Sequence, residues 1–259
     1  MTGHVDPGSP VPVTPAVEAS DLRKTFGSIQ AVDGITLSLP AGRIYGLLGP
    51  NGSGKTTLIR LLTGLARPSS GQASVLGIPM PSRTNLARIG YMTQADGVYG
   101  ELSVFENVRF FATLYGVTDR DAMLAALRLV ELDGRTTTLA GELSGGMRRR
   151  LSLACALVHA PPIAFLDEPT VGIDPALRVQ FWEHFRTIAA TGTTFVISSH
   201  VMDEADRCDE LVFMREGRVI ARGTGGDLRA GAGTDDLEQA FLRFAEHGAS
   251  ASASVSEQP

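Results

Sequence analysis

A glycine-rich segment near the start of the chain has the residue types needed to hold a phosphate group. It fits the pattern GxxxxGK[ST] at every fixed position and consists of Gly49, Pro50, Asn51, Gly52, Ser53, Gly54, Lys55 and Thr56. Glycine lets the backbone wrap closely around phosphate, and a helix that follows presents its positive end to the anion. Lys55 would neutralise charge on the β- and γ-phosphates, and Thr56 would hold Mg²⁺ through its hydroxyl. The pattern predicts phosphate binding rather than an inert turn, but alone it does not separate kinases, GTPases and transport ATPases.

Two adjacent acids, Asp167 and Glu168, end an apolar run that begins at Ile163. Neighbours on a strand point to opposite faces, so the two carboxylates cannot do the same work. Asp167 suits Mg²⁺ binding, and Glu168 suits polarisation of an attacking water, a role worth ~10²–10⁴ in rate. The alternative is that these acids merely end a strand and cap the next helix. A phosphate loop upstream in the same chain favours the catalytic interpretation.

A second candidate anion site follows Leu143. The residues Ser144, Gly145 and Gly146 precede a long helical pattern, and a helix N-terminus of this kind favours negative charge. One chain does not need two phosphate cradles for one nucleotide. We therefore expect this second cradle to close on a nucleotide held by a partner chain.

The order of these motifs resembles the ATP-binding cassette (ABC) family. LSGG lies just upstream of a DEPT strand, and the loop GPNGSGKTT, ending at Thr57, precedes both. The resemblance covers about residues 17–223. Met147 stands where many members have Gln, and Ile173 where they have Leu, but the serine and both glycines are intact. The resemblance implies a head-to-tail sandwich of two ATPase subunits that closes on ATP and opens after hydrolysis.

The same resemblance implies roles for four further residues. Phe26, in KTFG, would stack on adenine. Gln94, in YMTQ, would contact Mg²⁺ and link the site to a helical lobe. Asp174, in VGIDP, would signal between subunits, and His200, in ISSH, would contact the γ-phosphate. Each has a simpler interpretation in isolation, such as a core aromatic or a capping histidine, but their order along the chain favours a shared ATP site, with Glu168, His200 and Lys55 as its catalytic residues.

Composition limits the class of protein. The 259 residues carry a net charge of −5, which gives no global basic field and argues against nucleic acid as a partner. The two cysteines, Cys155 and Cys208, lack metal-site spacing. No apolar stretch approaches the ~20 residues of a membrane span, so a separate transmembrane permease subunit would have to provide the spans. We expect a peripheral subunit on the cytoplasmic face of the cell membrane, with ATP and Mg²⁺ as its cofactors.

Alternating strand-like and helical patterns predict an α/β domain with a mostly parallel sheet. The resemblance implies a P-loop NTPase core at residues 16–233, with an N-terminal antiparallel β part and an inserted helical subdomain at about 97–160. An amphipathic stretch predicts a C-terminal helix at 234–246. The Pro/Gly-rich residues 1–15 and the small, polar residues 247–259 are predicted to be disordered tails.

The branch of the family is less sharply defined. SGGMRRRL and LEQAFLRF resemble the branch that exports drugs, antibiotics and polysaccharides. An importer subunit remains an alternative, as does a cassette ATPase of iron–sulfur assembly. The single cassette without a long coiled-coil insert disfavours translation and DNA-repair types, and the LSGG-to-DEPT order disfavours a P-loop kinase.

Overall fold

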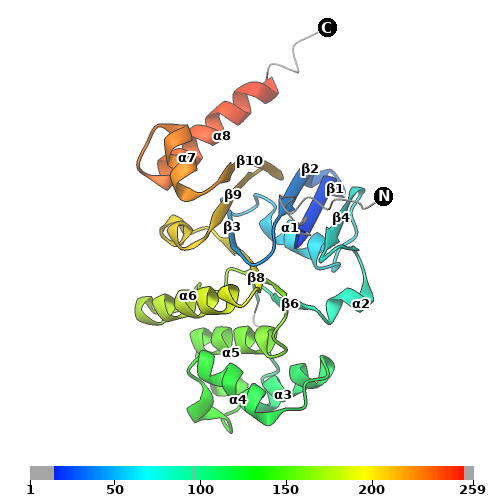
Figure 1. Cartoon of the computed structure of the whole chain (residues 1–259), viewed down its shortest axis with the longest axis vertical. Coiled ribbons are helices and arrows are strands. Elements are labelled where there is room, and N and C mark those ends of the chain that lie inside the picture. Colours follow the sequence, from blue (N-terminus) through cyan, green and yellow to red (C-terminus); the bar gives the residue numbers. More distant parts are fainter. Residues whose placement is uncertain (1–14, 96, 254–259) are drawn as a thin grey trace, which may run out of the picture.

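The computed structural model describes residues 15–95 and 97–253, so residues 1–14 and 254–259 of the two predicted tails lie outside the described residues. A six-stranded sheet forms the centre, in the order β10-β9-β3-β8-β7-β6 (Figure 1). Every neighbouring pair in it is parallel except β9 and β10. Its strands are β3 (Ile44–Leu48), β6 (Ile89–Met92), β7 (Ile163–Asp167), β8 (Thr194–Ser199), β9 (Glu210–Arg215) and β10 (Arg218–Gly223).

Strands β3, β7 and β8 are buried along their whole length. Central parallel strands are covered on both faces, which is why they read in the sequence as continuous apolar runs rather than as alternating patterns. The phosphate loop follows β3, the acid pair lies at the end of β7, and His200 follows β8. Because parallel strands end at the same edge of a sheet, this topology gathers the three motifs at one place.

A second, antiparallel sheet has the order β2-β1-β4-β5. Side chains from β1 and β2 share one core with helix α1 and with β3 of the central sheet. The expected antiparallel β part is therefore confirmed. The elements of this part are β1 (Val17–Phe26), β2 (Ile29–Leu39), α1 (Lys55–Leu62), β4 (Ser70–Val75), β5 (Ile78–Pro79) and α2 (Arg83–Leu86).

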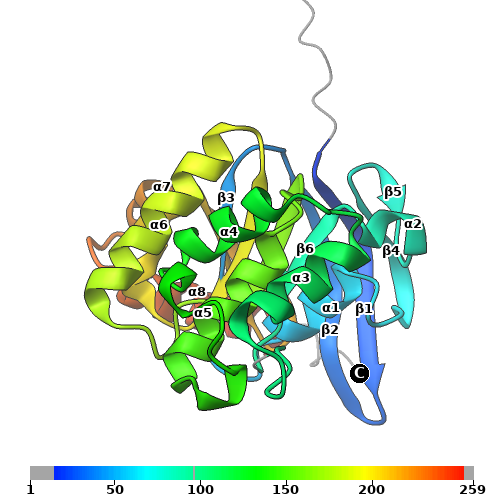
Figure 2. The same cartoon turned by 90° about the horizontal axis from the view of Figure 1, so that it is seen from below.

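The stretch between β6 and β7 is helical, as predicted. Helices α3 (Val104–Leu114), α4 (Arg120–Leu129) and α5 (Gly145–Leu157) pack together and lie apart from the antiparallel sheet (Figures 1 and 2). Their buried side chains join those of β7, β8 and α6 (Pro175–Ala190) in one apolar cluster. This shared cluster fixes α5 against the end of the strand that carries the acid pair.

The C-terminal part differs from expectation. Helix α7 (Gly225–Ala232) was not foreseen, and α8 covers Leu237–Ala253 rather than 234–246. Residues 247–253, predicted to be disordered, continue this helix because alternate alanines favour helix more than the small polar composition suggests. Leu237 and Phe241 of α8 pack with Leu228 and Phe213. Across the described ranges, no helix combines the length and the apolar character that crossing a membrane requires.

Candidate nucleotide-binding site

A cleft of about 530 Å³ opens beside the phosphate loop. Three separate parts of the predicted site line it: the loop itself, Gln94 after β6 and Glu168 after β7. The first strands of the antiparallel sheet supply another wall, which the sequence patterns did not indicate. The lining residues are Ile29, Gln30, Ala31, Asn51, Gly52, Ser53, Gly54, Lys55, Thr56, Thr57, Gln94, Glu168 and Glu216.

The shape of the loop depends on glycine at two points. Gly52 has φ of +81°, and a Cβ added there would meet no atom within 4 Å, so the backbone lies open to a ligand. Gly54 has φ of +100°, and an added Cβ would lie 2.4 Å from the carbonyl oxygen of Ala31. Gly54 also caps α1 without a side-chain hydrogen bond, which leaves the N–H groups of the first turn directed at the cleft.

Lys55 is buried beneath the loop, and its Nζ donates to the carbonyl oxygens of Gly49 at 2.6 Å and Pro50 at 3.0 Å. An ammonium group has three protons, so one donor remains beyond these two bonds. Burial lowers the pKa of Lys55, while the charges of Glu168 and Asp167 act in the opposite direction. The carboxylates therefore help to keep a buried cation available for an anionic ligand.

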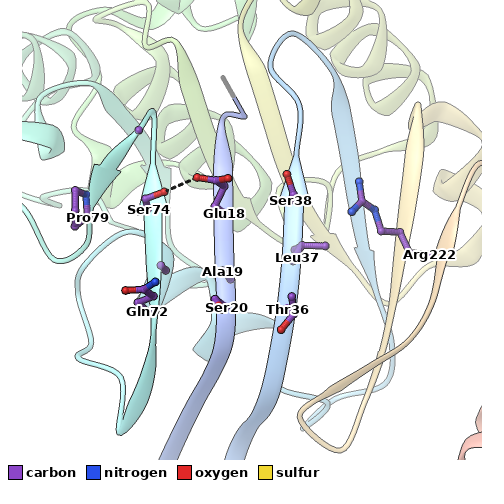
Figure 3. Close-up of a pocket in the computed structure, with 12 residues that line it drawn as sticks. Glu18, Ala19, Ser20, Thr36, Leu37, Ser38, Gln72, Ser74, Pro79 and Arg222 are labelled. Atoms are coloured by element: carbon purple, nitrogen blue, oxygen red, sulfur yellow. Dashed lines mark hydrogen bonds between the residues drawn. The ribbon is translucent and has the colours of Figure 1, made fainter. Parts of the chain in front are cut away.

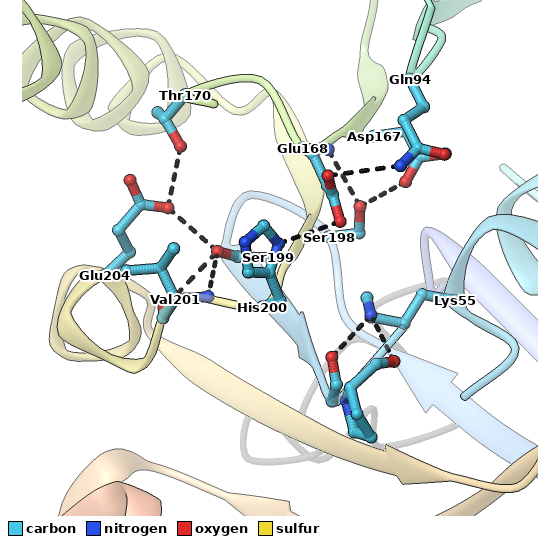
Figure 4. Close-up of polar contacts among 12 residues, drawn as sticks. Lys55, Gln94, Asp167, Glu168, Thr170, Ser198, Ser199, His200, Val201 and Glu204 are labelled. Carbon is cyan, nitrogen blue, oxygen red and sulfur yellow. Dashed lines mark hydrogen bonds and ion pairs between the residues drawn. The ribbon is translucent and has the colours of Figure 1, made fainter. Parts of the chain in front are cut away.

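Glu168 is the meeting point of two other predicted site residues (Figure 4). Nε2 of Gln94 donates to its Oε2 at 3.4 Å, and Nδ1 of His200 lies 3.1 Å from its Oε1. Glu168 itself has φ of +54°, a conformation that non-glycine residues rarely adopt. Three segments distant in sequence thus converge on one carboxylate beside the phosphate loop, an arrangement suited to acid–base work on a bound nucleotide.

Asp167 lies deeper, with its side chain among β-strand ends. Its Oδ1 accepts a hydrogen bond from Ser198 Oγ, whereas its buried Oδ2 has no hydrogen-bond partner in the part of the chain described. A buried carboxylate oxygen without a partner is costly, and a divalent cation would satisfy it. Thr56 and Gln94 line the cleft, whereas Asp167 lies outside its lining. A carboxylate, a hydroxyl and an amide oxygen are donor types that Mg²⁺ prefers, so the chemistry of these residues fits this ion.

Comparison with known proteins places this arrangement in a family. The model of the ABC transporter family matches residues 32–171, which is more than half of the chain. The Nod factor export ATP-binding protein I of Burkholderia lata is 42% identical over 219 residues, which are 82% of this chain and 72% of that protein. This chain belongs to the ABC transporter family.

Other relatives of the cassette support the same assignment. The probable multidrug ABC transporter ATP-binding protein YbhF of Escherichia coli is 41% identical over 238 residues, 88% of this chain but only 41% of that protein. The chain thus spans less than half the length of this relative. A solved ATP-binding subunit of an ABC transporter, 28% identical, superposes with a TM-score of 0.82 over 89% of this chain and 99% of the other. The P-loop NTPase fold of the cassette is therefore established.

Some predicted residues of the cassette lie outside the cleft. Phe26 is 51% exposed and pairs across the β1–β2 hairpin with Ile29, a residue of the cleft wall. Ser144 caps α5 by accepting from Met147 N at 3.3 Å, and this end of the helix is exposed. Asp174 caps α6 in the same way, accepting from Leu177 N at 3.0 Å.

The two caps belong to adjoining segments. A Cβ added to Gly146 would lie 2.9 Å from the carbonyl oxygen of Gly172, close to Asp174 in the chain. The candidate anion site at Ser144–Gly146 and the VGIDP segment that contains Asp174 therefore adjoin in the cassette. These two segments take no part in the lining of the cleft.

Sequence patterns missed several side chains that hold the site together. Ser198 Oγ donates to Asp167 and accepts from Glu168 N at 3.0 Å, so one hydroxyl fixes both acids. Buried Glu204 accepts from Thr170 at 2.9 Å and from Ser199 at 3.2 Å, which ties the segment after β7 to the segment before His200 (Figure 4). Ser198 lies in the ISSH motif, of which only His200 is assigned a role from the sequence, and Glu204 belongs to no motif that the spacing could reveal.

A larger groove, of about 600 Å³, crosses the outer face of the antiparallel sheet (Figure 3). Small polar side chains line much of it, and Ser74 Oγ donates there to Glu18 at 3.3 Å. It contains none of the residues predicted to bind ATP. Size alone therefore does not identify the nucleotide site of the cassette; the convergence on Glu168 does.

Proposed function

We propose that this chain binds ATP and Mg²⁺ in the cleft and hydrolyses ATP to ADP and phosphate to drive transport through a separate membrane permease. The observation that carries the proposal is the convergence of Gln94 and His200 on Glu168, beside the Lys55 loop. A phosphate-binding turn alone would need none of these three partners.

In this proposal each side chain near the cleft has a distinct task. Lys55 and the backbone of the loop hold the phosphates, and Glu168 orients the attacking water and accepts its proton. His200, within hydrogen-bond distance of Glu168, steadies that carboxylate and reaches the γ-phosphate. Asp167, Thr56 and Gln94 would hold Mg²⁺, which supplies neutralisation of phosphate charge when bound. Phe26, at the exposed tip of the hairpin, stacks on the adenine ring.

A second ATPase subunit, identical or related, completes the site. Ser144 and Gly145 are exposed, Gly146 is partly buried, and all three lie outside the cleft of their own chain. Their backbone N–H groups would cap the nucleotide held by the second subunit, and Asp174, on the adjoining segment, would contact that subunit. Loss of the γ-phosphate after hydrolysis would remove the bridge between the subunits and allow them to separate.

The permease would dock on the helical part. Phe110 makes edge-to-face contacts there with Tyr99 and Phe111, and both Phe110 and Leu114 are exposed. Phe110 and Leu114 line a groove of about 360 Å³ together with Arg109 and Glu106. An exposed apolar groove edged by charges is typical of a protein-binding surface. The groove lies along α3 and includes Leu102 and Glu106 of the segment 98–107 that follows Gln94, so movement at the nucleotide can reach it. Docking there would hold the chain peripherally at the cytoplasmic face of the membrane.

Export is the direction that we propose, because the relatives reported above are named for multidrug transport and Nod factor export. The substrate class would be a drug-like molecule, an antibiotic, or a lipid or polysaccharide. An importer subunit would share the whole ATP site, and so would an ABC ATPase without a transport role. Transport assays with the permease in sealed vesicles separate these three, since each predicts a different direction of flux or none.

The decisive test of the ATP site is Glu168→Gln. We expect ATP binding within about threefold of wild type, a loss of turnover of about 10³-fold, and a stable ATP-bound dimer by light scattering, since the amide cannot accept the proton. Glu216→Gln is the matched control, because Glu216 lines the same cleft without contacting Glu168 and should turn over normally. Phosphate release by Glu168→Gln close to that of wild type would refute the assigned role.

A further inference from the structure

The side chain of Arg149, on helix α5, contacts the main chain of the segments that carry Gln94 and Glu168. This side chain is buried, with the residue only 6% exposed. Its guanidinium donates to main-chain carbonyl oxygens of two segments, those of Thr93 and Gln94 after β6 and those of Asp167 and Glu168 at the end of β7. One cationic group therefore joins the two chain segments that carry the amide and the carboxylate of the proposed site.

The neighbouring arginines on α5 point elsewhere. Arg148 donates to Leu143 O at 2.7 Å, before its own helix. Arg150 donates to Val130 O at 3.1 Å, after helix α4, and lies 3.8 Å from Glu131. In the sequence the three form one basic run, but a helix turns about 100° per residue, so only Arg149 faces the strand ends. A buried guanidinium requires several acceptors, and its two terminal nitrogens find four in these carbonyls.

The hydrogen bond from Arg149 to Glu168 O helps to support the unusual backbone conformation of Glu168. At φ of +54° the peptide units around Glu168 need support from their surroundings to persist. Ser198 supplies it on the N–H side through its Oγ at 3.0 Å, and Arg149 on the carbonyl side through a bond of 2.6 Å to Glu168 O. Arg149 also holds Gln94 O, so it fixes both ends of the Gln94–Glu168 side-chain contact.

We propose that Arg149 is a positioning residue that sets the relative placement of Gln94 and Glu168 and couples it to α5, the helix that begins with Gly145. Through this rigid connection, engagement of the N-terminus of α5 by the nucleotide of a second subunit would alter the catalytic geometry in its own cleft. The inference rests on the proposed function for the roles of Gln94 and Glu168, and it predicts cooperativity between the two ATP sites of a dimer.

The test compares Arg149→Gln and Arg149→Lys with Arg150→Gln, which removes a partly buried arginine from the same helix without touching the site. For Arg149→Gln we expect kcat to fall about 10²-fold, since a displacement of about 1 Å has that cost, with KM and ATP binding within about threefold. The Hill coefficient should fall towards one. Arg149→Lys should recover part of kcat, because an ammonium reaches fewer of the four carbonyls. Arg150→Gln should retain kcat within about threefold.

A double-mutant cycle keeps the proposal testable if Arg149→Gln does not fold, as judged by its thermal unfolding. The cycle combines Arg149→Lys with Gln94→Ala, and we expect strong non-additivity in kcat, because both changes act on the same contact. An unchanged kcat and Hill coefficient in Arg149→Lys, or additive effects in the cycle, would overturn the proposal. Glu168→Gln is measured in parallel: if it still hydrolyses ATP, the proposed function fails, whereas its inactivity beside fully active Arg149 variants rejects the positioning role alone.

Discussion

Two glycine-flanked helix N-termini in this chain have opposite surroundings. The start of α1 is capped by Gly54, which has no side chain to satisfy the first N–H groups, and it lies at the wall of a cleft with buried Lys55. The start of α5 is capped by Ser144, whose hydroxyl already accepts from Met147 N, and it faces solvent. The first can grip an anion with groups from its own chain. The second offers a cap that needs a nucleotide held elsewhere, so we expect different outcomes when each is altered.

Removal of the cation at the α1 end should have the largest effect. In Lys55→Ala, ATP affinity should fall at least about 10²-fold and hydrolysis should be lost, because the phosphates lose a charge-assisted bond in a partly buried site. Equilibrium binding of a fluorescent ATP analogue to the purified chain measures this. An ATP affinity of Lys55→Ala within about threefold of wild type would show that the N-terminus of α1 is not the main phosphate-binding site.

Obstruction of the α5 end should affect turnover rather than binding. In Ser144→Arg we expect hydrolysis to fall about 10²-fold, since the cap would lose access to the γ-phosphate, while a single chain still binds ATP within about threefold. Ser38→Arg, at an exposed serine on the outer face of the antiparallel sheet, serves as control. If ATP binding by the single chain falls as far as turnover does, the two ends do not differ as proposed.

A mixture of these two variants sharpens the comparison. Where two copies of this chain pair, a dimer of Lys55→Ala with Ser144→Arg contains one site made of an intact phosphate loop and an intact cap, because each comes from the unaltered end of a different subunit. In an equimolar mixture with random pairing, about half of the dimers combine the two variants and each of these has one intact site of two, so we expect mixing to restore up to about a quarter of the wild-type activity. Phosphate release that stays at the level of the separate variants would argue against sharing between copies of this chain.

The outer edge of the cleft should contribute less. Phe26→Ala should weaken ATP binding about tenfold, since stacking of a base on an aromatic ring is worth ~1–3 kcal/mol. Phe26→Tyr keeps the ring and should bind within about twofold of wild type. Because the guanine of GTP can also stack on the ring, Phe26→Ala should weaken the binding of ATP and of GTP by similar factors. Equal ATP affinity of wild type, Phe26→Ala and Phe26→Tyr would show that adenine does not stack on Phe26.

How far the sequence predicts this molecule depends on whether a residue acts through its local pattern or through its place in the fold. The apolar run from Ile163 to the acid pair predicts a strand, and β7 covers Ile163–Asp167, one residue short of Glu168, because burial is a local property that the sequence pattern reflects. The contacts of Arg149 could not be predicted, because the basic run gives no sign of which arginine faces the strand ends. The unpartnered oxygen of Asp167 likewise becomes evident only when β7 and β8 lie side by side.

The smallest expected effect is on stability and comes from the C-terminal end of α5. Its test leaves the N-termini of α1 and α5 unchanged. His159, just after this helix, stacks on Tyr115 with ring centroids 3.7 Å apart, and burial lowers its pKa to about 4, partly offset by the main chain of Ile89. The folded protein therefore keeps His159 neutral at pH values where the unfolded chain, with an ordinary pKa of about 6.5, takes up a proton. Stability should be full above pH 6.5 and should decline as the pH falls towards 4.

The expected slope from His159 is less than about 1 kcal/mol per pH unit, because its ring is only partly shielded from solvent. His159→Phe preserves the stack and removes the titration, so the free energy of unfolding, measured in urea between pH 7 and 4.5, should decline less steeply in the variant than in wild type. His184→Phe is the control, because His184 lies on a different helix, α6, and is only partly buried. If the free energy of unfolding depends on pH in the same way in wild type and in His159→Phe, the titration of His159 does not contribute to stability and only the packing of its ring on Tyr115 does.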